Sequence, residues 1–148
     1  MNPSYNNTRP INMLLVEDSP TDQLMTREAL ERSKVLLNLH IVEDGIQTME
    51  FLRRSGKYAQ APRPDLILLD LNLPKKDGRE VIAEIKAAPD LKMIPVVVLT
   101  TSKSDEDILL AYKSHANCFI TKPVGFANFN EVMRSIERFW FSIVSLPP

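Results

Sequence analysis

Short apolar runs that alternate with amphipathic segments constrain the fold of this 148-residue chain more than any other feature. The runs are largely aliphatic and are bounded by polar residues, which is typical of strands covered on both faces in a parallel sheet. They occupy residues 12–16, 37–42, 66–69, 95–99 and 118–120. Each interval between them is long enough for a helix, so the pattern predicts a doubly wound α/β fold.

Signals for helix starts and stops lie in the intervals between the runs. Ser19 followed by Pro20 favours a helix start, and the spacing from Ser104 to Asp107 matches that from Ser19 to Asp22. The other helices are expected from near Gly45 to near Gly56, from Arg79 to Ala88, and from Phe126 to about Val144.

Five strands alternating with five helices indicate one doubly wound α/β domain with a parallel sheet over residues 11–148, and right-handed crossovers restrict its topology further. Residues 1–10 are polar and contain proline, so we expect a flexible N-terminal tail.

The composition limits the classes of partner. Lys and Arg total 18 against 19 for Asp and Glu, so the formal charge of -1 gives no basis for a nucleic-acid or membrane partner. Cys118 is the only cysteine, which excludes an internal disulfide and a cysteine-based metal cage. The sequence has no stretch typical of a signal peptide or a membrane span. We therefore expect a cytoplasmic protein.

Acidic residues follow two of the apolar runs. Glu17 and Asp18 come directly after the first run, and Asp70 comes directly after the third. A lone acid after a strand is usually a helix cap or a turn residue. If the first and third strands are neighbours, however, all three carboxylates meet at one sheet edge, where their repulsion favours a bound cation. Since no His or Cys lies nearby in the sequence, the pattern favours Mg²⁺.

Polar residues also end the last two strands, at Thr100 and Lys122. A threonine hydroxyl can donate to a phosphoryl oxygen, and a lysine ammonium can offset its charge. The same edge is therefore expected to accommodate a phosphoryl group beside the metal.

With these residues in place, the chain resembles the response-regulator receiver family, the phospho-accepting domain of two-component signalling. The resemblance covers residues 12 to about 143 and is carried by LVED at 15–18, LDLNLPKKDG at 69–78, PVVVLT at 95–100, and Lys122-Pro123. The runs LDLNLPKKDGREVIAEIK and DLKMIPVVVLTTS, and the tail ending in SLPP, are similar to the stand-alone response regulators of cyanobacterial phytochromes.

The resemblance implies a flavodoxin-like fold with a five-stranded parallel sheet in the order 2-1-3-4-5, and it implies a role for each site residue. Asp70 is implied to take a phosphoryl group from a phosphohistidine of a sensor histidine kinase, here a phytochrome. The implied Mg²⁺ ligands are Glu17, Asp18, Asp70 and the backbone carbonyl of Asn72. Lys122 is implied to contact the acyl phosphate, Thr100 to be the switch hydroxyl, and Phe119 to be the switch aromatic residue.

Two other functions compete with this interpretation. A phosphatase of the haloacid-dehalogenase type also uses Asp and Mg²⁺, but it needs a second acid two residues after the nucleophile, where this chain has Asn72. A receiver-like interaction module that is never phosphorylated is disfavoured because every site residue is present. We expect no enzymatic activity other than catalysis of its own phosphorylation and dephosphorylation. No DNA-binding output domain is expected, and an unknown downstream protein would receive the signal.

The C-terminal helix predicts a homodimer. Its apolar stripe comprises Phe126, Phe129, Met133, Ile136, Trp140 and Ile143 and would anchor the helix to the sheet. The apolar residues off the stripe are Val132, Phe139, Phe141 and Val144, and exposing them together is typical of an interaction surface. We expect a dimer interface that includes Phe139, Trp140 and Phe141. The alternative is that residues 145–148 fold back over these side chains.

Overall fold

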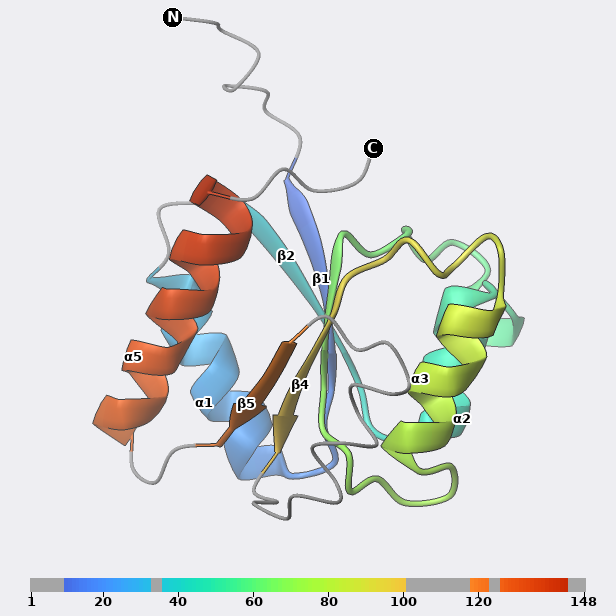
Figure 1. Ribbon diagram of the computed structural model, residues 1–148, viewed down its shortest axis with the longest axis horizontal. Coiled ribbons are helices and arrows are strands. Elements are labelled where there is room, and N and C mark those ends of the chain that lie inside the picture. Colours follow the sequence, from blue (N-terminus) through green and yellow to red (C-terminus); the bar gives the residue numbers. More distant parts are fainter. Residues whose placement is uncertain (1–9, 33–35, 101–117, 123–125, 144–148) are drawn as a thin grey trace, which may run out of the picture.

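The computed structural model describes residues 10–32, 36–100, 118–122 and 126–143. Within them the strands form one sheet in the order β2-β1-β3-β4-β5, and all neighbouring pairs are parallel (Figure 1). The strands are β1 (Ile11–Val16), β2 (Leu37–Val42), β3 (Leu66–Leu69), β4 (Val96–Thr100) and β5 (Cys118–Thr121). The predicted parallel, flavodoxin-like sheet is confirmed.

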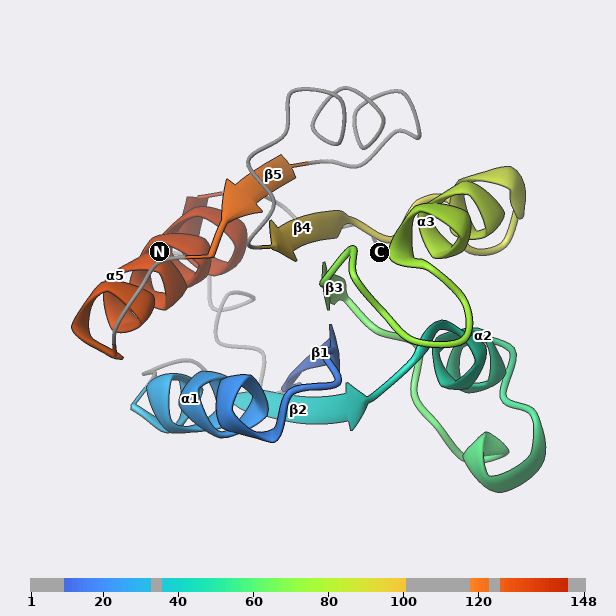
Figure 2. The same cartoon turned by 90° about the horizontal axis from the view of Figure 1, so that it is seen from below.

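Helices cover both faces of this sheet (Figure 2). One face carries α1 (Pro20–Glu31) and α5 (Phe126–Glu137), and the other carries α2 (Gly45–Leu52) and α3 (Gly78–Ala87). Successive residues of β1 alternate between the two cores: Leu14 belongs to one apolar cluster, and its neighbours Met13 and Leu15 belong to the other. This alternation follows from the two-residue period of a strand and explains why the central strands are apolar throughout.

Some predictions fall on residues that the structure does not describe. The helix expected to begin at Ser104 lies in 101–117, and the expected tail lies almost wholly in 1–9. The boundaries given for the tail and the domain therefore remain predictions. In the described part of the chain, no helix has the length and apolar character needed to cross a membrane.

The expected start of α1 is confirmed, whereas α2 ends earlier than predicted. The Ser19 side chain accepts a hydrogen bond of 3.3 Å from the backbone N–H of Asp22. Helix α2 stops at Leu52 rather than near Gly56, because Arg54 takes a left-handed φ of 55°. The backbone N–H groups of Arg54 and Ser55 then donate to the last carbonyls of the helix, which is the Schellman ending usually made by glycine.

The C-terminal helix has the predicted length but changes type. It is α-helical to Glu137 and then continues as a π-helix over Arg138–Ile143. Four residues of the predicted stripe are buried together in the core between α1, α5 and the sheet, which confirms that the stripe anchors the helix: Phe129, Met133, Ile136 and Trp140.

Two leucines on α1 test whether the sheet-facing core determines stability. Leu30 is 5% exposed and Leu24 is 56% exposed. Leu30→Ala should lower the free energy of unfolding by about 2–5 kcal/mol, because it leaves a cavity in the core. Leu24→Ala, the same change on the same helix, should cost less than about 0.5 kcal/mol. Urea unfolding measures both, and equal losses would contradict the assigned burial.

Candidate metal and phosphoryl site

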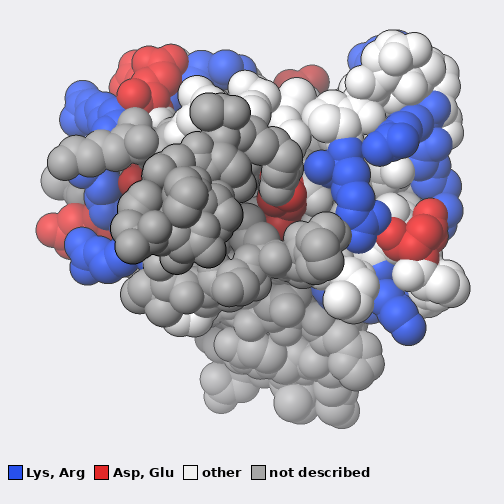
Figure 3. Space-filling view, turned by 90° about the horizontal axis from the view of Figure 1, so that it is seen from above, with Lys and Arg blue, Asp and Glu red and all other residues white. Residues whose placement is uncertain are grey.

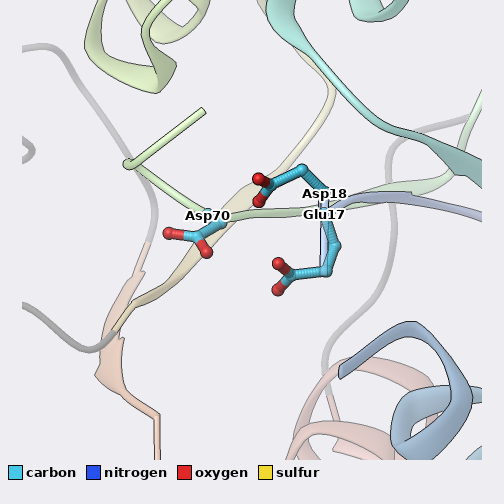
Figure 4. Close-up of side chains that lie close together, drawn as sticks. All are labelled: Glu17, Asp18 and Asp70. Atoms are coloured by element: carbon cyan, nitrogen blue, oxygen red, sulfur yellow. The ribbon is translucent and has the colours of Figure 1, made fainter. Parts of the chain in front are cut away.

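The sheet brings three carboxylates together at one edge. Glu17 and Asp18 follow β1, and Asp70 follows β3; these strands are parallel neighbours with Val16 opposite Leu69. One carboxylate oxygen from each acid lies within 4.8 Å of the others. Figure 4 shows the side chains of Glu17 and Asp18 both extending towards Asp70. The three carboxylates therefore lie together at one sheet edge, as the sequence predicts.

Backbone hydrogen bonds continue the sheet for one residue into the site and fix the acids. The Glu17 N–H donates to the Val42 carbonyl at 3.0 Å, and the Asp70 N–H donates to the Val16 carbonyl at 3.1 Å. The Asp70 Oδ1 atom accepts from the backbone N–H of Asn72 at 3.0 Å. Glu17 is 3% exposed and Asp70 is 9% exposed, whereas Asp18 faces solvent.

Lys122 enters this cluster from the end of β5. Its Nζ atom lies 3.1 Å from Asp70 Oδ2 and 2.6 Å from Asp22 Oδ2, and it also pairs with Glu17. Its side chain is only 7% exposed. Asp22 is a site residue that the sequence pattern does not reveal, because its place three residues after Ser19 is explained equally well by helix capping.

Burial and neighbouring charges have opposite effects on the pKa values of Glu17 and Lys122. Burial raises the pKa of Glu17 above its usual value, although the Lys122 ammonium partly opposes the rise. Burial alone would lower the pKa of Lys122, but its hydrogen bonds to Asp22 and Glu17 and the charges of Asp70 and Glu17 raise it far above its usual value. Lys122 therefore stays charged at any physiological pH.

The cluster carries an excess of negative charge. Glu17, Asp22 and Asp70 contact the Lys122 ammonium group, which is the one cation paired with this cluster among the described residues, and Asp18 lies beside Glu17 and Asp70. Glu17, Asp18 and Asp70 offer only oxygen ligands. An excess of carboxylate oxygens is the donor set preferred by hard divalent cations. The residues present therefore fit a divalent metal ion at this edge.

The loop between β3 and α3 is held against the start of α2. A Cβ atom added to Gly45 would lie 2.2 Å from the Lys76 carbonyl oxygen, so the two backbones touch. Lys75 has a left-handed φ of 65°, and its Nζ atom lies 3.6 Å from Asp44 Oδ2. Asp44 in turn caps α2 by accepting from the Gln47 N–H at 2.7 Å. These contacts fix the loop that begins with Asp70 and Asn72.

The other predicted residues are placed only in part. Thr100 ends β4, and Phe119 lies in β5 opposite Val98, but their side chains are outside the described part of the structure. Their switch roles remain predictions. Phe139 is 49% exposed, whereas Trp140 is 9% exposed and packs in the core of its own chain. The interface roles expected for Phe139, Trp140 and Phe141 remain predictions. The Phe141 side chain is also outside the described part.

Comparison with known proteins places this geometry in a family. The model of the response regulator receiver domain matches residues 13–134. The chain belongs to the response regulator receiver family. It is therefore a receiver domain of two-component signalling, which implies a sensor kinase as its partner and a divalent metal in its acidic site.

Among individual members of the family, the chain is similar to response regulators of cyanobacteria. The receiver domain is 51% identical over 135 residues to the response regulator Rcp1 of Synechocystis sp. The aligned residues make up 91% of this chain and 92% of Rcp1. It superposes on the phosphorylated cyanobacterial phytochrome response regulator RcpA with a TM-score of 0.91 and 50% identity, covering 95% of this chain and 100% of that one. For the Mn²⁺-bound form of Rcp1 the TM-score is 0.90 at 50% identity, with 94% and 100% covered.

Gly45 provides a test of how the receiver domain positions its metal site. Gly45→Ala should push Lys76 and the loop away from α2 and weaken divalent-metal binding about tenfold or more, the usual cost of disturbing groups that orient metal ligands. Gly56→Ala is the control for metal affinity: its φ of 56° makes the change cost some stability, but no atom lies within 4 Å of a Cβ there, so the change displaces no neighbour. Calorimetric titration with Mn²⁺ measures both. Equal affinity in Gly45→Ala and the parent would contradict this role for Gly45.

Proposed function

We propose that Asp70 accepts a phosphoryl group from a phosphohistidine of a sensor histidine kinase. The observation that carries this proposal is the contact of 3.1 Å between Lys122 Nζ and Asp70 Oδ2, at an edge where three carboxylates gather. An acid paired with a buried ammonium and placed beside a cation-binding cluster is suited to in-line attack on phosphorus.

Mg²⁺ is the proposed metal, held by Asp18, Asp70 and the backbone carbonyl of Asn72, with Glu17 beside them. When bound, the ion would neutralise charge on the transferring phosphoryl oxygens. The donor chemistry supports this choice, since Glu17, Asp18 and Asp70 offer only oxygen ligands and Asp18 faces solvent, from which an ion would enter.

Two other protein groups would assist the transfer, one by orienting Asp70 and one by offsetting charge. The Asn72 N–H holds Asp70 Oδ1 and so orients the carboxylate. The new bond joins a carboxylate oxygen of Asp70 to phosphorus while the phosphorus–nitrogen bond of the phosphohistidine breaks, leaving a neutral histidine on the kinase. Lys122, kept charged by its neighbours, offsets the charge of the resulting acyl phosphate.

The proposed partner kinase is a phytochrome, and the proposed output is a change in protein–protein contacts. Identity of about half to Rcp1 and to the phytochrome response regulator RcpA supports the first point. For the second, we propose that Thr100 moves towards the acyl phosphate and that Phe119 responds, which shifts the population of two states. Asn72 two residues after Asp70 disfavours the alternative of a phosphatase.

A homodimer is also proposed, with Phe139 at its interface. Phe139 borders an apolar hollow of about 370 Å³ between β5 and α5, which is lined by Cys118, Ile120, Glu131, Val132, Ser135, Ile136, Phe139 and Trp140. An exposed aromatic ring beside such a hollow gives two copies a complementary contact about a two-fold axis.

Asp70→Asn tests the phosphoryl acceptor. Labelled phosphate from an autophosphorylated cyanobacterial phytochrome should move to the parent in Mg²⁺ and not to Asp70→Asn, because the amide is not a nucleophile. Asp90→Asn, an exposed acid elsewhere, should be labelled like the parent. Labelling of Asp70→Asn to the parent level would sink the acceptor assignment. Labelling by acetyl phosphate but not by the phytochrome would contradict only the proposed kinase.

Phe139→Ser tests the dimer by sedimentation equilibrium. The variant should weaken self-association about tenfold or more, the loss expected for an aromatic residue at the centre of an interface. Met93→Ser, which changes an apolar residue that is 58% exposed elsewhere, should leave association unchanged. A parent that remains monomeric with and without beryllofluoride, a mimic of the acyl phosphate, would refute the dimer.

A further inference from the structure

A second hollow lies at the edge of the sheet opposite Asp70. Its volume is about 340 Å³, and it is lined by Leu52, Arg53, Arg54, Arg63, Pro64, Asp90 and Leu91. These residues come from the end of α2, the segment before β3 and the turn after α3. Since β3 runs from Leu66 to Leu69 with Asp70 after it, the length of this strand separates the hollow from the acidic site.

Positive charge dominates the rim of this hollow. Three of its lining residues are arginines and one is an aspartate. Among the described residues, no carboxylate pairs with Arg53, Arg54 or Arg63. Figure 3 looks onto this end of the molecule and shows Lys and Arg gathered on the side that carries α2 and α3, with acidic side chains among them. The rim therefore keeps guanidinium groups that can bind an external anion.

A hydrogen bond and the end of α2 fix the positions of these arginines. Arg63 Nη1 donates to the Asp90 carbonyl oxygen at 2.6 Å, which leaves its other N–H groups for a ligand. Arg53 and Arg54 sit at the capped end of α2, where Arg54 holds a φ of 55° that glycine would adopt more easily. The negative end of the α2 dipole and Asp90 oppose an anion here, but three full positive charges outweigh them.

The floor of the hollow has a different character. Leu52, Pro64 and Leu91 are all buried and apolar. A guanidinium rim above an apolar floor suits a ligand with an anionic head and an apolar body, because arginine binds phosphate through two parallel hydrogen bonds while the floor removes apolar surface from water. The volume is also in the range of small-molecule sites.

We propose that this hollow, bounded by Arg53, Arg54 and Arg63, binds a small organic phosphate. The phosphate group contacts the guanidinium rim, and the apolar part of the ligand packs on Leu52, Pro64 and Leu91. This site is separate from the acceptor aspartate, so it does not depend on the proposed phosphotransfer. It gives the receiver domain a second place at which a phosphorylated compound can act on it.

Phenyl phosphate is a suitable probe, with inorganic phosphate and phenol as its two halves. The measurement is an amide NMR titration of the Asp70→Asn protein in EDTA, which removes phosphorylation and metal-assisted binding at the acidic site. Phenyl phosphate should shift the amides of residues 52–54, 63 and 90–91 saturably, and it should bind about tenfold or more tightly than either half.

Charge-matched variants decide whether the hollow itself is responsible. Arg63→Gln and Arg53→Gln should each weaken phenyl phosphate binding about tenfold, the loss expected for one charge-assisted contact. Arg53→Gln keeps the bond from Arg63 to Asp90 and so guards against a loss caused by local unfolding. Lys57→Gln removes the same charge from the neighbouring turn, outside the lining residues, and should weaken binding less than about twofold.

Two results would overturn the proposal. Equal weakening by Lys57→Gln and Arg63→Gln would mean that the surface attracts anions without a defined site. Inorganic phosphate binding as tightly as phenyl phosphate would mean that the apolar floor is not used and that the ligand is not an organic phosphate.

Discussion

The site depends on one buried ammonium group. Lys122 comes from the end of β5, yet its Nζ atom contacts carboxylates that follow β1, begin α1 and follow β3. Removing a single ion pair partner from such a place is costly, because the remaining charge is left without compensation. The pairing therefore requires β1, β3 and β5 to end at the same edge, and parallel strands with right-handed crossovers meet that requirement.

A second constraint is steric and acts on the backbone. Gly78 lies so close to the start of its own loop that an added Cβ would be 2.6 Å from the Asp70 carbonyl oxygen, and Gly45 meets Lys76 in the same way. The loop is thus fixed at its base and near its tip, while Asp70 sits at its beginning. The Lys122 ammonium group holds the carboxylates together. Backbone packing limits how far the loop can move when these carboxylates bind a cation or a phosphoryl group.

The features predictable from the sequence are those encoded by local pattern. Apolar runs located the strands, and the polar residues after them located Glu17, Asp18, Asp70 and Lys122. The end of α2 was not predictable, since Arg54 takes a conformation usually reserved for glycine. The part played by Asp22 was also hidden, because a carboxylate in the first turn of a helix already has a local explanation. Contacts across the sheet, such as the one between Asp22 and Lys122, appear only when the chain is folded.

The contacts of Lys122 also indicate how a phosphoryl group would be accommodated. An ammonium group has three N–H donors, and Lys122 faces three carboxylates, so a phosphoryl oxygen must replace one of them. The contact with Asp70, at 3.1 Å, is longer than the 2.6 Å contact with Asp22, and it involves the very carboxylate that phosphorylation would change. We infer that Lys122 exchanges Asp70 for the phosphoryl oxygen and keeps Asp22. Helix α1 would then stay tied to the site through Asp22, which agrees with the proposed response through Thr100 and Phe119.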